Sequence, residues 1–338
     1  MLAVVIVFEV TIKVKAIGLD VGHSAVKIAF SRSPAQDTAL IPTAVVPAFS
    51  LYDDAAAKRA DRDTVQVEGK KYFVGDTAIS QGGIRTTPGL HEDWVQTAQH
   101  DALLLAGKRR AIEQGADEDA LIVLGLPAGL YARQRDALRE RASRLLGSEV
   151  MVMSQPFGPF SQHMIDERGV LRSAHALESE SWAVIEVGYF TTDFTLIRKG
   201  LWIEDKTASC SGVSRATERL RKGLSVAGTS ATLMECEEIL RTSKMRNFGE
   251  TLDMSGQVAD ALAPLSAEIM DTADALFAAD ARGLDGIILT GGGCDYVLDA
   301  IRQRWPKVVK PASPRFSVAE GMRRQGEFKL RMREQVEA

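Results

Sequence analysis

The chain has 338 residues, of which 45% are hydrophobic and 25% are charged, and its formal net charge is −4. This length favours two domains with separate cores, and the composition is that of an ordinary globular protein. The slightly acidic balance excludes a strong electrostatic attraction to nucleic acid or to an anionic membrane. We therefore expect neither direct nucleic-acid binding nor membrane association.

The cysteine count and the N-terminus bear on the compartment. The three cysteines are odd in number and lack metal-ligand spacing, which favours a reduced, cytoplasmic setting. The apolar run near the N-terminus is short and is soon followed by charged residues, unlike a signal peptide. Two interpretations of residues 1–14 stay open, an extra edge strand or a start placed upstream of the native one.

The first half of the chain begins with strands. β-branched and aliphatic residues predict strands at 14–19, 25–30 and 39–46. A polar stretch at 50–64 interrupts the pattern, and 64–75 has the form of a hairpin that turns at Glu68-Gly69. Helical spacing and a terminal glycine then predict helices at 94–115 and 133–147, with a buried strand at 120–127 between them. Residues 149–166 follow with a strand, a Pro/Gly break and a helix.

The second half repeats this order. Strands are predicted at 182–187, 193–197 and 201–206, helices at 212–224, 231–241 and 257–279, then a strand at 286–291 and a helix at 295–305. Two units of three strands, each followed by alternating helices and strands, predict a duplicated α/β fold with helices covering each sheet.

Two hairpins carry the candidate chemistry. In "AIGLDVGHSAVKIAF" a buried strand ends at Asp20, a turn contains Gly22, and the outgoing strand carries Lys27. In "VIEVGYFTTDFTLI" Glu186 and Gly188 stand in the corresponding places. Glycine lets backbone N–H groups approach an anion, a carboxylate can hold hydrated Mg²⁺, and lysine is a point charge for phosphate. Each hairpin alone is a common motif, but two facing each other would clamp a polyphosphate.

A glycine triplet is the third feature. In "GIILTGGGCDYVLDAI" a buried strand is followed by Gly291, Gly292 and Gly293, and a helix is expected to start near Asp295. Glycines at a strand-to-helix junction permit close backbone approach to a ligand. The triplet does not fit G-x-G-x-x-G, and the chain has no G-x-x-x-x-G-K-[ST] sequence. A dinucleotide fold and a P-loop are therefore both poorly supported.

Together the three segments resemble the actin, sugar-kinase and heat-shock-chaperone ATPase superfamily. "GLDVGHSAVK" looks like its first phosphate loop, "IEVGYFTTD" like its second, and "LTGGG" like its adenosine loop. The phrases "GLPAGLYARQRDALRE", "SQPFG", "GVSRATERL" and "PRFSVAEGM" resemble the bacterial actin-like ParM/StbA group of plasmid-segregation ATPases. The resemblance covers roughly residues 15–325 and implies an actin-like fold.

This resemblance implies domain limits. Domain I is expected at 15–180 with an insertion at about 47–95, and domain II at 181–318. A C-terminal helix at 319–338 is expected to return to domain I. The nucleotide would bind in the cleft between the two domains.

The resemblance also implies site residues. Asp20 and Glu186 would hold Mg²⁺, through water, and Gln155 would orient the attacking water. The residues implied to contact the phosphates or the nucleoside are Gly22, His23, Ser24, Lys27, Gly188, Thr191, Thr192, Gly212, Gly291, Gly292, Gly293, Tyr296 and Arg315. For Gln155 a hinge or helix-capping role stays open.

Two residues depart from the pattern of the group. Actin-like proteins usually carry aspartate where this chain has Glu186, so the metal geometry is open to change. His23 replaces the usual small hydroxyl residue, which weakens the expectation of a side-chain contact to phosphate there.

The function implied is an ATPase that binds Mg-ATP and forms filaments, moving plasmid DNA through an adaptor protein bound to the centromere. Phosphoryl transfer to water would depend on positioning and charge neutralisation. Two alternatives stay open, a small-molecule kinase of the same superfamily and a weakly hydrolysing, nucleotide-gated scaffold. The preference for ATP over GTP is also left open.

Overall fold

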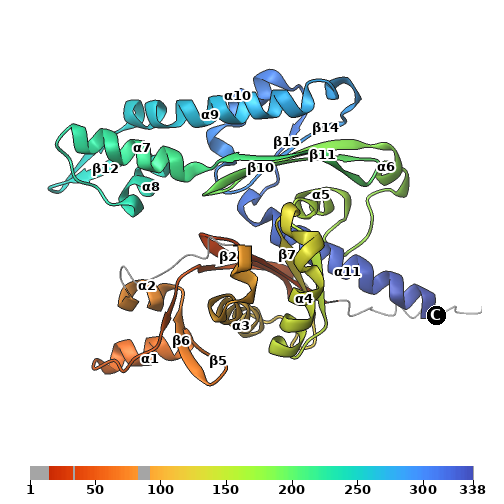
Figure 1. Cartoon of the computed structure of the whole chain (residues 1–338), viewed down its shortest axis with the longest axis horizontal. Helices are drawn as coiled ribbons and strands as arrows, with labels where there is room; N and C mark the ends of the chain where they lie inside the picture. The colour runs from red at the N-terminus through yellow and green to blue at the C-terminus, as the bar shows by residue number, and fades with distance from the viewer. Residues whose placement is uncertain (1–14, 33–34, 83–91, 338) are drawn as a thin grey trace, which may run out of the picture.

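Two five-stranded mixed sheets with the same strand order form the centre of the structure (Figure 1). The computed structural model describes residues 15–32, 35–82 and 92–337, so residues 1–14 lie outside the described part. The sheet orders are β3-β2-β1-β7-β8 and β11-β10-β9-β14-β15. In each sheet the first three strands in chain order form antiparallel pairs. The fourth strand then pairs parallel with the first, and the fifth pairs parallel with the fourth. The predicted duplicated α/β architecture is confirmed.

The first sheet separates two layers of helices. It comprises β1 (Ala16–Val21), β2 (Ala25–Arg32), β3 (Ala35–Pro42), β7 (Leu121–Leu126) and β8 (Val150–Ser154). Alternate residues of a strand face opposite sides of the sheet. Ile17 and Leu19 therefore pack with α3 (Ala98–Glu113) and α4 (Ala128–Leu146), whereas Ala16 packs with α11 (Ser317–Glu337).

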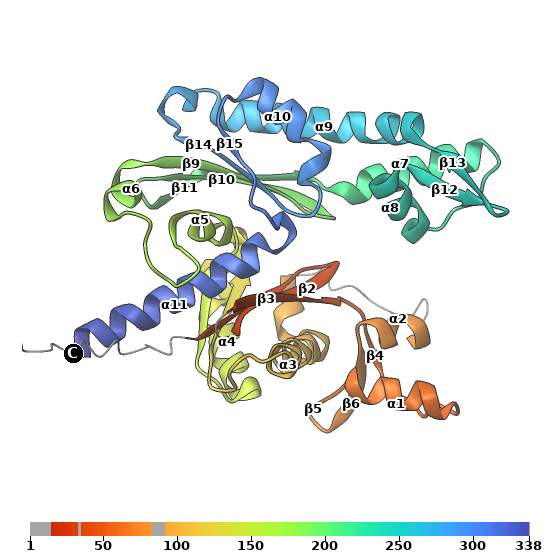
Figure 2. The ribbon, with the colours of Figure 1, turned by 180° about the vertical axis from the view of Figure 1, so that it is seen from behind.

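The second sheet is covered in a similar way. It comprises β9 (Ser181–Val187), β10 (Thr191–Arg198), β11 (Leu201–Ser211), β14 (Gly286–Thr290) and β15 (Val308–Val309). One face packs against α7 (Val213–Val226), α8 (Leu233–Thr242), α9 (Ser255–Phe277) and α10 (Leu298–Arg304). The other face packs against α5 (Phe157–Met164) and α6 (Ala174–Ser179). Figure 2 shows α5 and α11 lying between the two sheets.

Two small lobes extend from the sheets. In the first, β4 (Val45–Pro47), β5 (Thr64–Val67) and β6 (Lys70–Val74) form a three-stranded sheet flanked by α1 (Asp54–Arg62) and α2 (Asp76–Gly82). In the second, the hairpin of β12 (Lys244–Asn247) and β13 (Glu250–Asp253) joins α8 to α9. Both lobes lie at the same end of the molecule (Figure 1).

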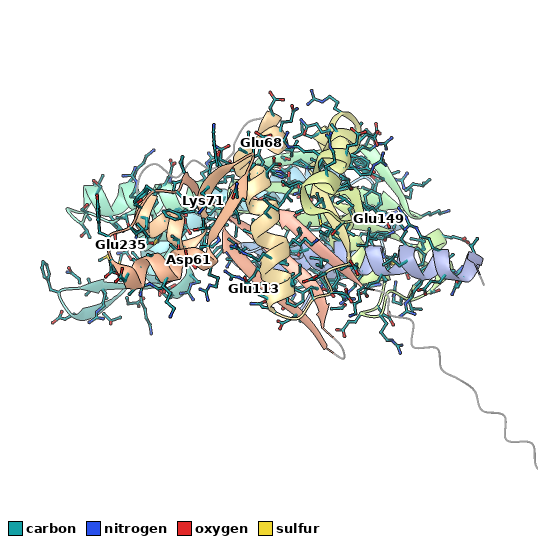
Figure 3. The ribbon with its side chains drawn as sticks, turned by 90° about the horizontal axis from the view of Figure 1, so that it is seen from below. Asp61, Glu68, Lys71, Glu113, Glu149 and Glu235 are labelled. Atoms are coloured by element: carbon teal, nitrogen blue, oxygen red, sulfur yellow. The ribbon has the colours of Figure 1, made fainter. Side chains whose placement is uncertain are left out.

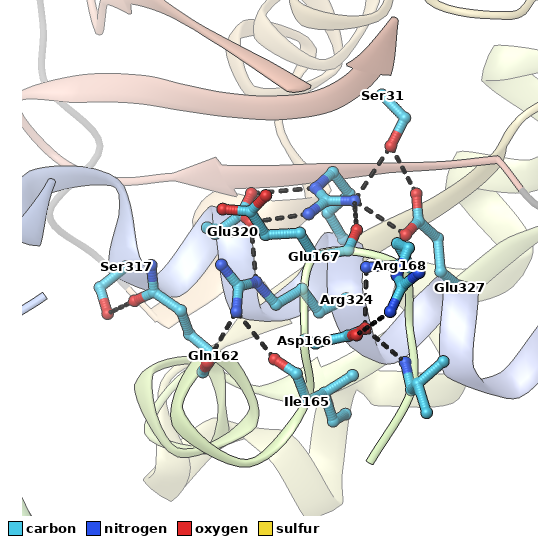
Figure 4. Close-up of polar contacts among 12 residues, drawn as sticks. Ser31, Gln162, Ile165, Asp166, Glu167, Arg168, Ser317, Glu320, Arg324 and Glu327 are labelled. Atoms are coloured by element: carbon cyan, nitrogen blue, oxygen red, sulfur yellow. Dashed lines mark hydrogen bonds and ion pairs between the residues drawn. The ribbon is translucent and has the colours of Figure 1, made fainter. Parts of the chain in front are cut away.

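Helix α11 is held in place by close backbone packing and by buried charges. A Cβ atom at Gly18 would lie 2.0 Å from the Ala319 carbonyl oxygen, so α11 can rest on β1 only because that position is glycine. The Arg323 side chain is fully buried and pairs with Glu320 and Glu327. Ser31 of β2 and Gln162 of α5 join the same network (Figure 4).

Several elements differ from the sequence-based predictions. The polar stretch 50–64 contains α1. The side chain of Asp53 caps the N-terminus of this helix by accepting a hydrogen bond from the Ala56 N–H. The strand predicted at 39–46 is split into β3 and β4 by a turn in which the Ala44 N–H bonds the Pro42 carbonyl. Helix α4 begins at Ala128 rather than 133, and β11 continues to Ser211 rather than 206. The elements α2, α6, β12, β13 and β15 were not predicted. No helix among the described residues is long and apolar enough to cross a membrane.

Candidate functional site

The turns of the two hairpins face each other across a cavity of about 510 Å³. Nine of the predicted site residues line it: Asp20, Gly22, His23, Ser24, Lys27, Gln155, Glu186, Gly188 and Thr191. They come from the strands and turns of the β1–β2 and β9–β10 hairpins and from the junction between β8 and α5. The equivalent position of β1 and β9 in sheets of identical order explains why the two hairpins meet.

Asp20 is the centre of a hydrogen-bonded group inside this cavity. It is 2% exposed, and one of its carboxylate oxygens accepts from Lys27 Nζ at 2.7 Å. The other oxygen accepts from Gln155 Nε2 at 3.0 Å. Asp20 and Lys27 are paired directly across the antiparallel strands β1 and β2, which fixes their separation. The cavity therefore contains a carboxylate that contacts both a cation and an amide.

Glu186 adds a second carboxyl group with unusual electrostatics. Burial raises the pKa of Glu186 to about 8, opposed by Lys27 and reinforced by Asp20 and Asp193. Burial alone would lower the pKa of Lys27, but Asp20 and Glu186 raise it above its ordinary value. Lys27 thus stays charged beside Asp20, and burial pushes the Glu186 carboxyl towards its protonated form.

The glycine N–H groups of the two turns, which the sequence suggested as donors to a ligand, are already hydrogen-bonded within their own hairpins. The Gly22 N–H bonds the carbonyls of Asp20 and Ala25, and the Gly188 N–H bonds the Thr191 carbonyl. The exposed residues His23 and Ser24 are therefore the candidate backbone donors of the first turn. The glycines keep their steric role, because a Cβ at Gly22 would lie 3.1 Å from Lys27 Nζ and one at Gly188 would lie 2.8 Å from the Thr191 carbonyl oxygen.

Aromatic rings bring the tips of the two hairpins together. The centroids of the His23 and Phe190 rings lie 5.8 Å apart in an edge-to-face arrangement, and Phe190 contacts Tyr189 in the same way. Although His23 is an exposed residue, partial desolvation of its ring lowers its pKa, and the neighbouring Lys27 lowers it further. The neutral His23 ring therefore contributes packing across the cavity rather than a positive charge.

Seven predicted residues do not line this cavity. The Thr192 side chain is fully buried and its hydroxyl donates to the Ser211 carbonyl, so this hydroxyl does not face the cavity. The others are Gly212, Gly291, Gly292, Gly293, Tyr296 and Arg315.

Three of the glycines among them, Gly212, Gly291 and Gly293, pack against the second hairpin. A Cβ at Gly212 would lie 2.6 Å from the Tyr189 carbonyl oxygen, and one at Gly291 would lie 2.4 Å from that of Val187. The Gly293 N–H donates to the same Val187 carbonyl. These contacts place the start of α7 and the glycine triplet directly beside the β9–β10 turn.

Tyr296 and Arg315 gather around an acidic residue of α8. Burial raises the pKa of Tyr296 and lowers that of Arg315, and Glu237 acts electrostatically on both. Burial raises the pKa of the Tyr189 hydroxyl in the second hairpin, and Glu237 raises it further. Glu237 therefore links the β9–β10 turn to the region expected to face the nucleoside.

The residues present fit a magnesium nucleotide. The acidic groups at the cavity are carboxylates, the ligand type that Mg²⁺ prefers, and Lys27 can meet a phosphate. No cluster of three or more His, Cys, Asp or Glu with metal-binding geometry occurs among the described residues. A hydrated magnesium ion would be held here by one or two carboxylates and by the phosphates.

Sequence reasoning missed three residues of this region. Asp193 lines the cavity and pairs with Glu186 across β9 and β10. Gly125 of β7 makes room for Gln155, since a Cβ there would lie 2.7 Å from Gln155 Cγ. A glycine inside an otherwise apolar strand was the available signal. No sequence signal pointed to Glu237, because it is one of several acidic residues on the exposed face of a helix.

Comparisons with known proteins identify the fold. Residues 18–158 match a family model described as the N-terminal domain of actin-like proteins. No curated protein matches the sequence. Among solved structures, the apo psk41 ParM protein aligns with a TM-score of 0.70 at 16% identity, covering 96% of this chain and 99% of that one.

Two further ParM structures also align over nearly the whole length of both chains. The 15-stranded ParM filament from Clostridium botulinum gives a TM-score of 0.69 at 16% identity, covering 93% of this chain and 99% of that one. The Bacillus thuringiensis ParM with ATP gives 0.63 at 14% identity, covering 96% and 99%. The chain therefore has the actin-like fold over nearly its whole length, as the resemblance seen in its sequence implied.

Proposed function

We propose that this chain is an ATPase that binds Mg-ATP in the cavity between the two hairpins and assembles into nucleotide-dependent filaments. The observation that carries the proposal is the convergence of Asp20, Lys27, Gln155 and Glu186 on one cavity between two sheets of identical topology. The similar ParM proteins solved with ATP and as a filament support both halves of the proposal.

We assign the domains accordingly. Domain I spans 15–180 with its insertion at about 47–95, and domain II spans 181–318. The C-terminal helix at 319–338 belongs with domain I, and its contacts with β1 and α5 support this. The cavity then lies between the domains, where a change in their relative orientation would alter it.

Each residue of the Asp20 group has a role in this proposal. Lys27 would exchange Asp20 for a phosphate oxygen, and Gln155, released from the same carboxylate, would orient the attacking water. Asp20 and Glu186 would hold the hydrated magnesium ion, which neutralises phosphate charge when bound. Glu186 must lose its proton for this, so binding of the ion should release a proton.

The proposed biological role is plasmid DNA segregation in the cytoplasm. The filament would reach the centromere through an adaptor protein, because the net charge of −4 gives no support for direct contact with DNA. This part rests on the similarity to ParM proteins alone.

One observation favours a second candidate, a weakly hydrolysing, nucleotide-gated scaffold. Burial favours the protonated form of Glu186, and a protonated carboxyl would hold magnesium less well. In a scaffold, nucleotide binding would still drive assembly, but phosphate release would be slow.

Sedimentation of the purified chain tests the proposal. With ATP and Mg²⁺ we expect the protein in the pellet, with phosphate released, and with ADP or after chelation of Mg²⁺ we expect it in the supernatant. Assembly without phosphate release would favour the scaffold. A chain that stays soluble in every nucleotide state and transfers phosphate to a small molecule would be a kinase, and the proposal would be wrong.

A further inference from the structure

The outer strand β8 of the first sheet has one edge without a neighbouring strand. The strand order ends at β8, and within the described part of the chain no strand pairs with its second edge. The Glu149 carbonyl and the Gln155 N–H both bond β7. The hydrogen-bonding direction alternates along a strand, so the N–H and C=O groups of Val150 and Val152 point to the open edge.

Open edges are usually protected against pairing with other chains, by charged residues, by proline or by short length. The outer strand on the other side of the same sheet, β3, contains Asp37 and Pro42. In the second sheet, β11 contains three charged residues at 204–206, and β15 has two residues. Strand β8 has five residues, VMVMS, with neither a charge nor a proline. It therefore lacks the protection that the other outer strands of the two large sheets have.

A groove of about 230 Å³ lies at this open edge. Residues 150–152 line it, together with α4 and with Lys329 of α11. The Val152 side chain packs on the core that α4 covers, and the Met151 side chain packs on the core that α11 covers. Glu149, which precedes β8 and forms an ion pair with α11, is labelled in Figure 3. The edge is thus flanked by a helix on each face of the sheet.

Cations gather at this groove although the chain as a whole has a net charge of −4. Arg135, Arg139 and Lys329 line the groove with a single carboxylate, that of Asp136. This carboxylate lies 3.7 Å from a guanidinium nitrogen of Arg135 and 3.2 Å from one of Arg139. It can neutralise one positive charge of the three, so the groove favours an acidic partner.

We propose that this edge groove binds an extended acidic segment of a partner protein, which adds to the first sheet as a further strand beside β8. The backbone groups of Val150 and Val152 would pair with the segment, and Arg135 and Arg139 would meet its carboxylates. A second copy of the chain is disfavoured as the occupant, because two such edges facing each other would bring like charges together.

The inference is independent of the proposed ATPase function. None of the residues that line this groove lines the cavity between the two hairpins. The groove therefore adds an interaction surface outside the proposed nucleotide site.

A short synthetic peptide of alternating glutamate and valine tests the chemistry of the occupant. Its alternate side chains would face α4 and α11 in turn, because successive side chains of a strand point to opposite faces of the sheet. Fluorescence anisotropy of the labelled peptide should show saturable binding that weakens as salt is added. A peptide of alternating lysine and valine is the control and should not bind.

Methylation of the peptide backbone tests the pairing with β8. The N–H groups of alternate residues in a strand point to opposite edges. N-methylation of either the glutamates or the valines should therefore abolish binding, while N-methylation of the other set should leave it unchanged. Equal effects of the two methylations would show that the segment does not pair as a strand, and the proposal would be wrong.

Substitutions in the chain test the location of the site. Val152→Pro removes an N–H that points to the open edge, so no bond to β7 is lost and the melting temperature should fall only slightly. Peptide binding should be lost. Arg139→Glu should weaken binding by about fivefold or more. Arg144→Glu makes the same charge change at an exposed position of α4 outside the groove, and it should bind as the unmodified chain does.

Other occupants are outcomes of the same experiments. Binding of a single-stranded oligonucleotide in place of the peptide, weakened by Arg139→Glu, would make this a nucleic-acid surface and overturn the proposal. Pairs of unmodified chains in analytical ultracentrifugation that Val152→Pro separates would assign the edge to a second copy. No peptide binding to the unmodified chain, or equal binding to Val152→Pro and Arg139→Glu, would also overturn it. None of these results bears on ATP hydrolysis, so the proposed function is tested separately.

Discussion

Gln155 donates its side-chain amide to Asp20, with Nε2 3.0 Å from Oδ1, while Lys27 occupies the other oxygen of the same carboxylate at 2.7 Å. This joins the end of β8 to the first hairpin. The contact ties the proposed water-orienting residue to the proposed metal-holding residue, so a ligand that engages either one must alter the partners of the other.

Asp20→Ala should abolish Mg²⁺-dependent hydrolysis, because the first hairpin loses its only carboxylate at the cavity. Nucleotide should still bind, since Lys27 is freed to meet a phosphate. Phosphate release and nucleotide affinity, measured on the same sample, check this. Asp20→Asn keeps the shape and the contact with Gln155 and should lose turnover as well. Unchanged turnover in both variants would remove Asp20 from the site.

Glu186→Asp should be tolerated or should raise activity, because it restores the carboxylate usual in actin-like proteins. Glu186→Gln retains the length but not the charge and should lose Mg²⁺-dependent turnover. The rate of phosphate release under saturating Mg-ATP is the measurement. A loss of more than about tenfold in Glu186→Asp, or about 1.4 kcal/mol of barrier, would show that the longer side chain is matched to this site.

The sequence could predict the two hairpins because their chemistry is local. Asp20, Gly22 and Lys27 lie within eight residues, and antiparallel pairing brings the charged pair together. Gln155 was found only through the resemblance, since its partner lies 135 positions away in the chain. Gly125 and Asp193 gain their meaning from neighbours across the sheet, which no local pattern shows.

The small lobes were the least predictable part of the fold. Helix α1 lies in a polar stretch and buries only Ala60, so its apolar signal is weak. The β12–β13 hairpin has mostly exposed strands and carries phenylalanine where turn chemistry favours asparagine or glycine. In both cases tertiary contacts, rather than local preference, decide the structure.

The chain should lose stability as the pH falls, and His100 should be one cause. His100 is 3% exposed, and burial, with Arg141, lowers its pKa from the ordinary 6.5 to about 3. Between these values the unfolded chain binds a proton that the folded chain does not, so the free energy of unfolding decreases below pH 6.5. The loss from this residue should reach about 2 kcal/mol at pH 5.

Urea unfolding at pH 7 and pH 5 checks the histidine prediction. His100→Phe keeps a ring against Trp94 and should show a smaller difference between the two pH values. His175→Asn changes an exposed histidine and should behave as the unmodified chain does. An equal pH dependence in the unmodified chain and in His100→Phe would contradict the assignment.

Arg323→Ala should destabilise the chain by about 3–5 kcal/mol, because it leaves Glu320 and Glu327 without their buried cation (Figure 4). Arg333→Ala is the matched control, since Arg333 pairs with Glu149 at a surface where both side chains are about half exposed. Its effect should stay within about 1 kcal/mol. Equal effects of the two substitutions on urea unfolding would show that the α11 network does not hold the helix.

Phosphate release by Gln155→Ala tests the central claim most directly, that the residues of this cavity hydrolyse ATP. Gln155 acts mainly in the transition state in this account, so hydrolysis should slow by about a hundredfold or more while ATP affinity stays near normal. Filaments formed with ATP should then persist longer. Normal phosphate release with weakened ATP binding would contradict the account and leave Gln155 as part of a hinge.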